Sequence, residues 1–587
     1  MKDEEIRSKC GIDAVTYLSF QRHILLLMTV VSLLSLAVIL PVNFSGNLQG
    51  DGPENFGRTT LANVSANFLW LHSIFALVYF IITLLCMAHH STQLEFRGDE
   101  KVSRTLMITS IPREISDPGL ITKHFHEAYP SCTVTDIRFC FDVHKLMKLD
   151  LERKAMKGRL YFTTKAQKEG KVMIMTHPCA QIFCCDICGF EKVSFVTLEE
   201  KRTDEFNAEK NRITMKRLGI AFVTFRDERM TAVIVKDYSR VHCRRRPQQS
   251  SVTTVVQSHK WGVSYAPAPS DIIWENLSVC GSRWWLRCVL LNILLFLLLF
   301  FFTTPAIIVN TMDKFNVTRP MESLRSPVIT QFLPTLLLWM FSVLLPFIVY
   351  YSAFFESHWT RSVENQVTMH KCFLLLVFMV IILPSLGLSR YSFSKFSHKT
   401  STLCVFLPDN GAFFVNYVIT SSLIGTSMEL LRIPALTVYA LRLCFAKSQA
   451  ERIHVKRSQA YEFQFGLEYA WTMCIFAVSM TYSITCPIIA PFGLLYVILK
   501  HMVDRYNIYY AYVPTKLNQK IHRAAISQVI VAPSLCMFWL LFFSVLRLGP
   551  VHPITLFTSV SLIFCVACYL FRMCLEKTPN KSTSYQV

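Results

Sequence analysis

Two carboxylates lie in apolar parts of the sequence, where charged side chains are rare. Glu429 belongs to the run Gly411–Tyr439, "GAFFVNYVITSSLIGTSMELLRIPALTVY", and Glu468 belongs to the next run, Phe463–Tyr482. Ionisable groups inside a membrane span usually face a polar pathway or pair with one another. Carboxylates along such a pathway attract cations. The chemistry that these two residues suggest is the selection and passage of ions.

The run that contains Glu429 also holds neutral polar residues and residues that permit bending. Asn416, Ser421 and Thr426 could line an opened path as hydrogen-bonding side chains. Gly425 and Pro434 interrupt the helical pattern of the run. Because glycine and proline are common causes of helix bends, we expect these two residues to form a gating hinge.

A structural role for Glu429 competes with the pathway role. Arg432 follows three residues later, which is the spacing of a local ion pair on a helix. With a helical rise of about 1.5 Å per residue, Glu429 lies about 25 Å from Ala412, in the cytosolic half of its span. By the same rise, Glu468 lies about 8 Å from the cytosolic start of the next span. The two carboxylates could therefore share one vestibule. We favour the ion pathway, with the Glu429–Arg432 pair as the alternative.

A second cluster of reactive side chains is "HPCAQIFCCDIC", His177–Cys188. Cys185 and Cys188 have zinc-ligand spacing, but a second cleanly spaced pair is lacking because Cys184 directly precedes Cys185. Interleaved apolar residues suggest a surface that touches lipid, where cytosolic cysteines become S-acylated. We expect S-acylation of Cys184, Cys185 and Cys188, with zinc binding and buried free thiols as alternatives.

Other motifs add little chemistry. The sequence shows no nucleotide-binding loop, catalytic dyad or metal-binding helix motif, so we expect no enzyme activity, no cofactor and no metal. The sequons at Asn63 and Asn316 are candidates for glycosylation. The basic run Arg240–Arg246 favours a solvated loop, and contact with anionic lipid is the second interpretation.

The elements that must position these residues are membrane-spanning helices. Of 587 residues, 52% are hydrophobic and only 17% are charged, against about 25% in soluble proteins. A span needs roughly 20 apolar residues in a helix. Ten runs qualify as candidates: Ile24–Leu40, Phe68–Ala88, Trp284–Asn310, Val328–Phe355, Cys372–Leu388, Ala412–Cys444, Phe463–Tyr482, Ile484–Met502, Ile526–Leu546 and Ile554–Cys574.

Basic residues in short loops predict the orientation of these spans. The loops Lys447–Arg457 and Lys500–Arg523 are rich in Lys and Arg, whereas Ser45–Ala66 holds only Arg58. By the positive-inside rule the two basic loops and both termini of this chain lie in the cytosol. The longest polar segment, Ser91–Ser282, then lies in the cytosol too. The formal net charge of +20 fits cytosolic loops beside anionic lipid.

The cytosolic segment shows the pattern of a small α/β domain. The expected order is strand, helix, strand, a helix-rich insertion, strand and helix, in the ranges Arg104–Pro112, Asp117–Pro130, Cys132–Val143, His144–Met215, Gly219–Phe225 and Asp227–Tyr238. Asp117 and Asp227 are the expected N-caps of the two helices. This order fits a ferredoxin-like sandwich.

The strand "LGIAFVTF", Leu218–Phe225, is similar to the central strand of RNA-recognition domains. Such domains stack bases on exposed aromatic residues of their two central strands. Here Ile220 and Met107 stand where aromatic residues are expected, and Leu218 replaces the basic residue. Only Phe222 remains as a stacking platform, so we expect the fold without nucleic-acid binding.

Four longer motifs resemble a known family. They are "SYAPAPSDIIWENL" (Ser264–Leu277), "TTPAIIVNTMDKFNVT" (Thr303–Thr318), "FLPDNGAFFVNYVI" (Phe406–Ile419) and "AYEFQFGLEYAW" (Ala460–Trp471). They resemble the animal branch of the calcium-permeable stress-gated cation channels, across nearly the whole chain. The resemblance implies a cytosolic RNA-recognition-like domain, a transmembrane core related to anoctamins, and opening by membrane tension or hyperosmotic stress.

The resemblance also implies the partners and the pore. We expect a monomer that passes calcium, sodium and potassium through a pore lined by the spans in residues 284–482, in contact with membrane lipids and with no nucleic acid. The alternative is a phospholipid scramblase that uses the same groove. A secondary transporter is a third class, but the sequence shows no internal repeat. The expected location is the plasma membrane, with the endoplasmic reticulum or endolysosomal membrane as alternatives.

The fold class is therefore an α-helical polytopic membrane protein with a cytosolic α/β domain. The family usually has one more span, before the segment that Met1–Gln21 resembles, so we expect ten spans here instead of eleven. The expected units are residues 1–90 (a cytosolic stub and two spans), 91–282 (the cytosolic domain), 283–575 (an eight-span channel core) and 576–587 (a cytosolic tail).

Overall fold

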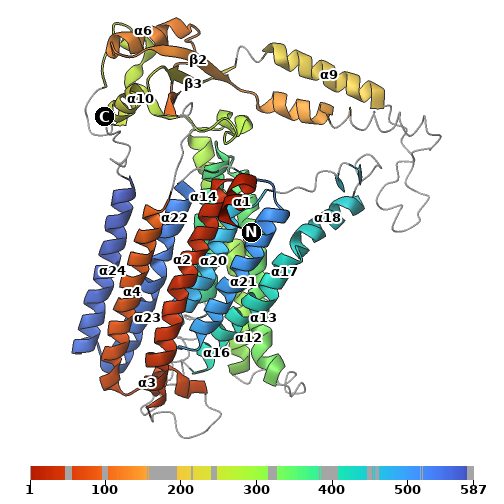
Figure 1. The fold of residues 1–587 in the computed structure, drawn as a ribbon. Coiled ribbons are helices and arrows are strands. Elements are labelled where there is room, and N and C mark those ends of the chain that lie inside the picture. The colour runs from red at the N-terminus through yellow and green to blue at the C-terminus, as the bar shows by residue number, and fades with distance from the viewer. Residues whose placement is uncertain are drawn as a thin grey trace, which may run out of the picture.

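The computed structural model shows a long bundle of helices with a small sheet-containing domain at one end (Figure 1). It describes residues 2–46, 56–94, 103–154, 195–212, 216–239, 247–314, 327–382, 408–445, 462–515 and 520–577, with a few isolated residues between these ranges. The described N-terminal helix, α1 (Asp3–Cys10), lies at the end of the bundle that faces the small domain.

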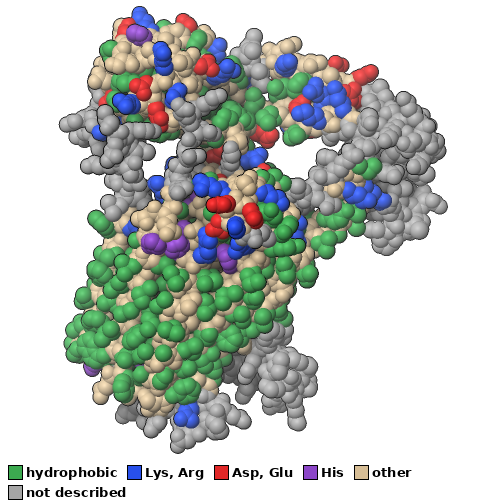
Figure 2. Space-filling view, in the orientation of Figure 1, with side chains coloured by type: hydrophobic (Ala, Val, Ile, Leu, Met, Phe, Trp, Pro, Cys, Tyr) green, Lys and Arg blue, Asp and Glu red, His purple; other side chains and the backbone are tan. Residues whose placement is uncertain are grey.

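The helices of the bundle follow the predicted apolar runs closely. Six described helices are long and apolar enough to cross a membrane: Ile12–Phe44, Leu69–Thr92, Leu338–Phe355, Arg361–Ile382, Lys520–Leu548 and Pro553–Arg572. The face shown in Figure 2 is covered by hydrophobic side chains, while charged and His side chains gather at the end of the bundle near the domain. Such an apolar belt with polar ends fits a helix bundle in a bilayer.

The bounds of the bundle helices are as follows: α2 (Ile12–Leu34), α3 (Leu40–Phe44), α4 (Leu69–Thr92), α12 (Ser282–Lys314), α13 (Pro327–Phe355), α14 (Arg361–Val377), α16 (Pro408–Thr420), α17 (Thr426–Leu430), α18 (Ile433–Phe445), α20 (Phe465–Tyr482), α21 (Ile489–Tyr510), α22 (Lys520–Val529), α23 (Val531–Leu548) and α24 (Pro553–Lys577). A π-helical segment, η1 (Ser35–Ile39), joins α2 to α3, and another, η9 (Phe378–Ile382), extends α14. Three predicted ranges are corrected: the first helix begins at Ile12 instead of Ile24, α14 begins at Arg361 instead of Cys372, and α21 continues to Tyr510 instead of ending at Met502.

Helix α20 lies at the centre of the bundle. Every side chain from Tyr469 to Tyr482 is buried, as expected for a helix that is apolar on all sides. Close contact with α14 requires a glycine near its start, because a Cβ atom at Gly466 would lie 2.4 Å from the backbone oxygen of Asn365. The absence of a side chain at Gly466 therefore sets the distance between α14 and α20.

The small domain contains a four-stranded antiparallel sheet in the order β2-β3-β1-β4. The strands are β1 (Thr105–Thr109), β2 (Val134–Phe141), β3 (Arg217–Phe225) and β4 (Gly262–Tyr265). Helix α6 (Pro118–Ala128) follows β1, and α10 (Glu228–Ser239) follows β3. The predicted succession of strands and helices is confirmed, and β4 is a strand that the sequence analysis missed.

Two local predictions within this domain can also be compared with the structure. Asp117 caps α6, since its carboxylate accepts a hydrogen bond from the Gly119 N–H at 2.8 Å. The helix-rich insertion is represented by helical residues 144–154 and by α9 (Phe195–Arg212), which project away from the sheet (Figure 1). Arg153 lies over the ring of Phe206 at 4.0 Å and holds the two helices together.

One face of the sheet rests on other parts of the same chain. Phe222 contacts Trp274 edge-on, with ring centroids 6.1 Å apart, and belongs to a hydrophobic cluster with Ile272, Leu277 and Trp359. Trp359 lies in the short connection between α13 and α14. The remaining candidate base-stacking residue therefore packs against the chain itself, which joins the domain to the helix bundle.

Candidate ion-pathway site

The segment predicted as one span, Ala412–Cys444, is a broken helix in the structure. After α16, residues 421–425 form a π-helical segment, η10 (Ser421–Gly425), and the short helix α17 follows. The chain then turns at Leu431 and Arg432 before α18 begins, and α18 leads away from the bundle (Figure 1). Single π-helical turns inside α-helices often occur at functional sites.

The two hinge candidates have different surroundings. Gly425 ends the π-helical segment with a helical φ of −59°, and a Cβ atom there would lie 3.7 Å from the indole of Trp339. The sharp break lies at Arg432, whose φ is +54°, a left-handed conformation that is uncommon outside glycine. Pro434 is the second residue of α18, a position where a helix tolerates proline. The predicted break at Pro434 is therefore corrected to Leu431–Arg432.

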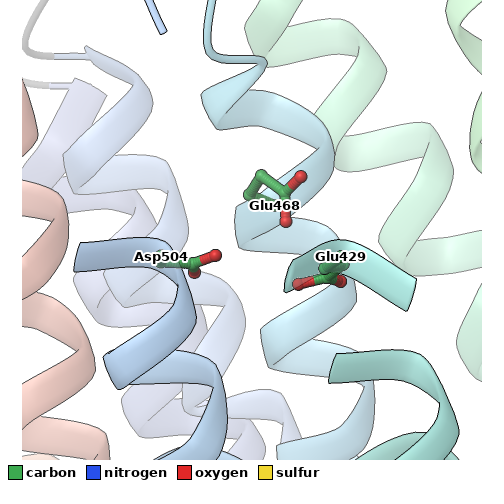
Figure 3. Close-up of side chains that lie close together, drawn as sticks. All are labelled: Glu429, Glu468 and Asp504. Atoms are coloured by element: carbon green, nitrogen blue, oxygen red, sulfur yellow. The ribbon is translucent and has the colours of Figure 1, made fainter. Parts of the chain in front are cut away.

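Three carboxylates from three helices meet beside this break. Glu429 of α17, Glu468 of α20 and Asp504 of α21 point toward one another (Figure 3), and one oxygen of each lies within 4.8 Å of the others. The prediction that Glu429 and Glu468 lie in one place is thereby confirmed. Asp504 is a third member that the sequence analysis placed in a cytosolic loop.

Lys500 of α21 connects all three carboxylates. Its Nζ atom lies 2.5 Å from Glu429 Oε2, 2.5 Å from Glu468 Oε2 and 2.9 Å from Asp504 Oδ1. The Lys500 side chain is 1% exposed, whereas the Glu429 and Glu468 side chains are 28% and 25% exposed. A buried ammonium group is stable only when it is well paired, and these carboxylates provide that pairing.

The alternative pairing of Glu429 with Arg432 is wrong for this structure. The carboxylate of Glu429 forms its ion pair with Lys500. The guanidinium of Arg432 instead lies over the ring of Tyr512, 5.0 Å from the ring centroid. The left-handed turn at Arg432 explains this, because it removes the residue from the helical register in which a side chain three residues away would face Glu429.

Helix α2 fixes the third carboxylate. Asp504 is 2% exposed, and its Oδ2 atom accepts hydrogen bonds from the Tyr17 hydroxyl at 2.7 Å and from Gln21 Nε2 at 2.6 Å. Sequence analysis missed Lys500 and Asp504 because both fall in the range Lys500–Arg523, which it interpreted as a basic cytosolic loop. Their spacing of four residues was the available signal, since it places both on one face of a helix.

The neutral pathway candidates lie further along the same segment. Asn416 is half-buried, whereas Ser421 and Thr426 are 0% and 5% exposed. The Thr426 hydroxyl donates a hydrogen bond to the carbonyl oxygen of Ser422, as hydroxyls within helices often do. Ser421 and Thr426 are thus enclosed in this structure, and exposing them to a pathway requires the helix to move.

The remaining candidates fall elsewhere. Cys184, Cys185, Cys188 and Asn316 lie outside the described residues. Glycosylation of Asn63 stays a prediction: in this fold the residue is 1% exposed, and its amide nitrogen donates hydrogen bonds to backbone oxygens at 2.8 and 2.6 Å. The sequon alone gave no sign of this, because burial depends on the fold around it.

Three family models match successive parts of the chain. A model described as "Late exocytosis, associated with Golgi transport" matches residues 1–90. A model for the cytosolic domain of a ten-span phosphate transporter family matches residues 103–276. A model described as "Calcium-dependent channel, 7TM region" matches residues 287–551, the part that contains the carboxylate cluster.

Curated relatives match over almost the whole chain. The zebrafish osmosensitive cation channel TMEM63C is 80% identical, over 100% of this chain and 73% of its own length. The chicken mechanosensitive cation channel TMEM63B is 54% identical, over 98% of this chain and 73% of its own length. The Arabidopsis hyperosmolality-gated Ca²⁺ permeable channel 1.6 is 22% identical, over 92% of this chain and 74% of its own length.

These relatives are named channels, while one of the shorter family models carries the name of a transporter. The relatives weigh more because their identity is high and covers the cytosolic domain and the helix bundle together. The chain belongs to the TMEM63 family of osmosensitive and mechanosensitive cation channels.

Proposed function

We propose that this chain forms a cation channel that opens under membrane tension or osmotic stress and conducts calcium, sodium and potassium. The pore lies within one protomer and is lined by helices of residues 284–482, the stretch that contains Glu429 and Glu468. The protein acts as a monomer with ten spans, in contact with membrane lipids. The observation that carries this proposal is the Lys500-centred carboxylate cluster beside a broken helix.

The ion pairs of Lys500 provide a way to hold the channel closed. Glu429 lies on the short helix α17, between the π-helical segment and the turn at Arg432, so that helix can move as a small unit. The contact with Lys500 ties this unit to α21. Opening requires α17 to separate from α21, which breaks one charge-assisted hydrogen bond and exposes Ser421 and Thr426 to the path.

Membrane tension supplies the work for this separation. A state with a larger area in the membrane plane becomes more favourable as the bilayer is stretched. Outward movement of α17 together with α18, which already leads away from the bundle, enlarges that area (Figure 1). Gly425 allows the bend because it adds no side chain against Trp339. The hinge that we propose is therefore the segment from Gly425 to Arg432.

The cytosolic domain has the RNA-recognition-like fold and serves as a support for the helix bundle. Its strand order and its two helices are those expected of that fold. The face that would stack bases in a nucleic-acid-binding member is covered by Ile272, Leu277 and Trp359. A covered face has no room for stacked bases, so we propose that this domain contacts protein instead of nucleic acid.

The direct test is reconstitution of the purified chain in liposomes. Suction applied to excised patches should open cation currents, and these should carry calcium when it replaces the monovalent ions. A parallel assay of lipid transfer between leaflets should show no increase under the same tension. Absence of tension-gated current from folded, correctly inserted protein would refute the channel, and lipid transfer without current would favour a scramblase.

A further inference from the structure

We propose that Lys500 is a tethered cation that occupies a divalent-cation site and thereby sets the ion specificity of the channel. In this interpretation the three carboxylates form a cage with the dimensions of a calcium site. The lysine fills the cage and prevents calcium from being held there. The inference rests on the proposed function for its effect on currents, but the cation site itself can be tested without any current.

The geometry of the carboxylates fits a calcium ion. Calcium binds oxygen ligands at about 2.3–2.6 Å, so two ligands on opposite sides of one ion lie about 5 Å apart. Oxygens of Glu429, Glu468 and Asp504 lie within 4.8 Å of one another. The Lys500 ammonium lies among them, within 2.9 Å of each. An ion in the place of that ammonium would therefore reach one oxygen of every carboxylate.

The charge of the cluster leaves room for a second cation. Three carboxylates and one ammonium group give a net charge of −2 if all are ionised (three negative, one positive). In the described part of the chain, Lys500 is the cation within ion-pair distance of Glu429 and Glu468. The other donors to Asp504 are the neutral side chains of Tyr17 and Gln21. Excess negative charge in a partly buried site attracts cations.

Two buried polar atoms beside the cluster give an independent indication. The Tyr496 hydroxyl and the Asn507 Oδ1 atom have no hydrogen-bond partner, although the two residues are 0% and 4% exposed. Tyr496 precedes Lys500 by four residues, which places it one turn away on the same face of α21. Asn507 adjoins the cluster, because its Nδ2 atom donates to the Glu429 carbonyl oxygen at 3.2 Å.

These atoms match what a cation and its water would need. Unpaired buried polar groups are costly, and those that persist in a structure commonly have a partner in water or an ion. Asn507 Oδ1 can accept a hydrogen bond from a water bound to the cation or can coordinate the cation itself. The Tyr496 hydroxyl can bond a second water. Both atoms thus extend the site along α21 on either side of Lys500.

Lys500 distinguishes this site from a calcium-binding site. To bind the three carboxylates, calcium must displace an ammonium group that is attached to the protein and is always present at high local concentration. Calcium is therefore not retained in the cage. When the lysine is removed, the three carboxylates repel one another and gain most from a divalent cation, so calcium should bind them, hold α17 against α21 and thereby obstruct the passage of sodium and potassium.

The experiment uses Lys500→Gln in the full chain, with Lys500→Arg as the matched control that keeps the positive charge. Potassium current is recorded in stretched patches while the free calcium concentration is raised. Lys500→Gln should be blocked at calcium concentrations at least tenfold lower than the wild type, and Lys500→Arg should behave like the wild type. Adding Glu429→Gln and Glu468→Gln to Lys500→Gln should remove the block.

Calcium binding is measured separately, as the rise in Tm of purified protein with added calcium, because a ligand that binds only the folded state stabilises it. Lys500→Gln should gain stability with calcium, the wild type should not, and magnesium should act more weakly because it requires a tighter octahedral shell. The Tm assay tests whether calcium binds the carboxylates even if the wild type conducts no current.

The proposal can still be tested if Lys500→Gln folds poorly. If Lys500→Gln is recovered only when calcium is present during purification, that result supports the site. If it is recovered under neither condition, the double variant Lys500→Gln with Asp504→Asn replaces it, since two carboxylates with no ammonium give the same net charge of −2 as the wild type. A variant that folds, shows no calcium-dependent Tm and has wild-type calcium block overturns the proposal.

Discussion

Glu429→Gln tests whether the ion pair between α17 and α21 holds the channel closed. The substitution preserves size, and its amide oxygen can still accept a hydrogen bond from the Lys500 ammonium, but it removes the negative charge of the acceptor. A hydrogen bond to a charged group contributes about 1.5–3 kcal/mol, against about 1 kcal/mol for a neutral one. Glu429 is 28% exposed and shares Lys500 with two other carboxylates, so the loss should lie near the lower end.

A loss of about 0.5–1 kcal/mol from the closed state alone corresponds to a roughly two- to fivefold rise in the ratio of open to closed channels. The channel should therefore open at lower tension, and the change should appear as a shift of the curve of open probability against suction. Single-channel conductance and calcium preference should change too, since one carboxylate has left the pathway. Both are measured in excised patches of reconstituted protein.

Glu462→Gln is the matched control for this prediction. Glu462 forms an ion pair with Arg361 at 3.0 Å, but both side chains are about half exposed, so its loss should have little effect on opening. Arg432→Gln should also leave the Glu429–Lys500 pair in place. If Glu429→Gln folds normally and neither the opening tension nor the permeation changes, the closed-state role of this pair is refuted.

Three further changes follow from the packing. Gly425→Leu should alter the tension needed for opening with little effect on ion preference, because its side chain must displace Trp339, whereas Gly425→Ala makes only an ordinary contact at 3.7 Å and should behave like the wild type in the same patch recordings. Gly466→Ala should lower the yield and Tm of the protein, by about 1–3 kcal/mol of unfolding free energy, since its Cβ atom would lie 2.4 Å from the Asn365 backbone oxygen. In the cytosolic domain, burial lowers the pKa of His124 from 6.5 to about 4. That depressed pKa adds stability which is complete above pH 6.5 and is lost as the pH falls toward 4, up to roughly 3 kcal/mol. The protection factors of the domain's slowest amides, which correct for the slower intrinsic exchange at low pH, should therefore fall between pH 7.5 and pH 5 in the wild type and much less in His124→Gln.

The sequence alone determined the local structure of this protein wherever short-range patterns were sufficient. Continuous apolar runs predicted the bundle helices because a helix that crosses hydrocarbon must satisfy its own backbone and present apolar side chains. Alternating and β-branched residues predicted three of the four strands, and Asp117 marked the start of α6 through its capping side chain. Strand β4 was missed because its four residues are too few to show a pattern.

The carboxylates of Glu429 and Glu468 were recognised from sequence because charges inside apolar runs are rare. The identity of their partner was not, because the choice between Arg432 and Lys500 depends on the backbone turn at Arg432 and on the packing of α17 against α21. Lys500 is 71 residues from Glu429 and 32 from Glu468 in the sequence. No local pattern relates positions so far apart, so only the tertiary packing of three helices, with Asp504 held by α2, decided which cation the carboxylates surround.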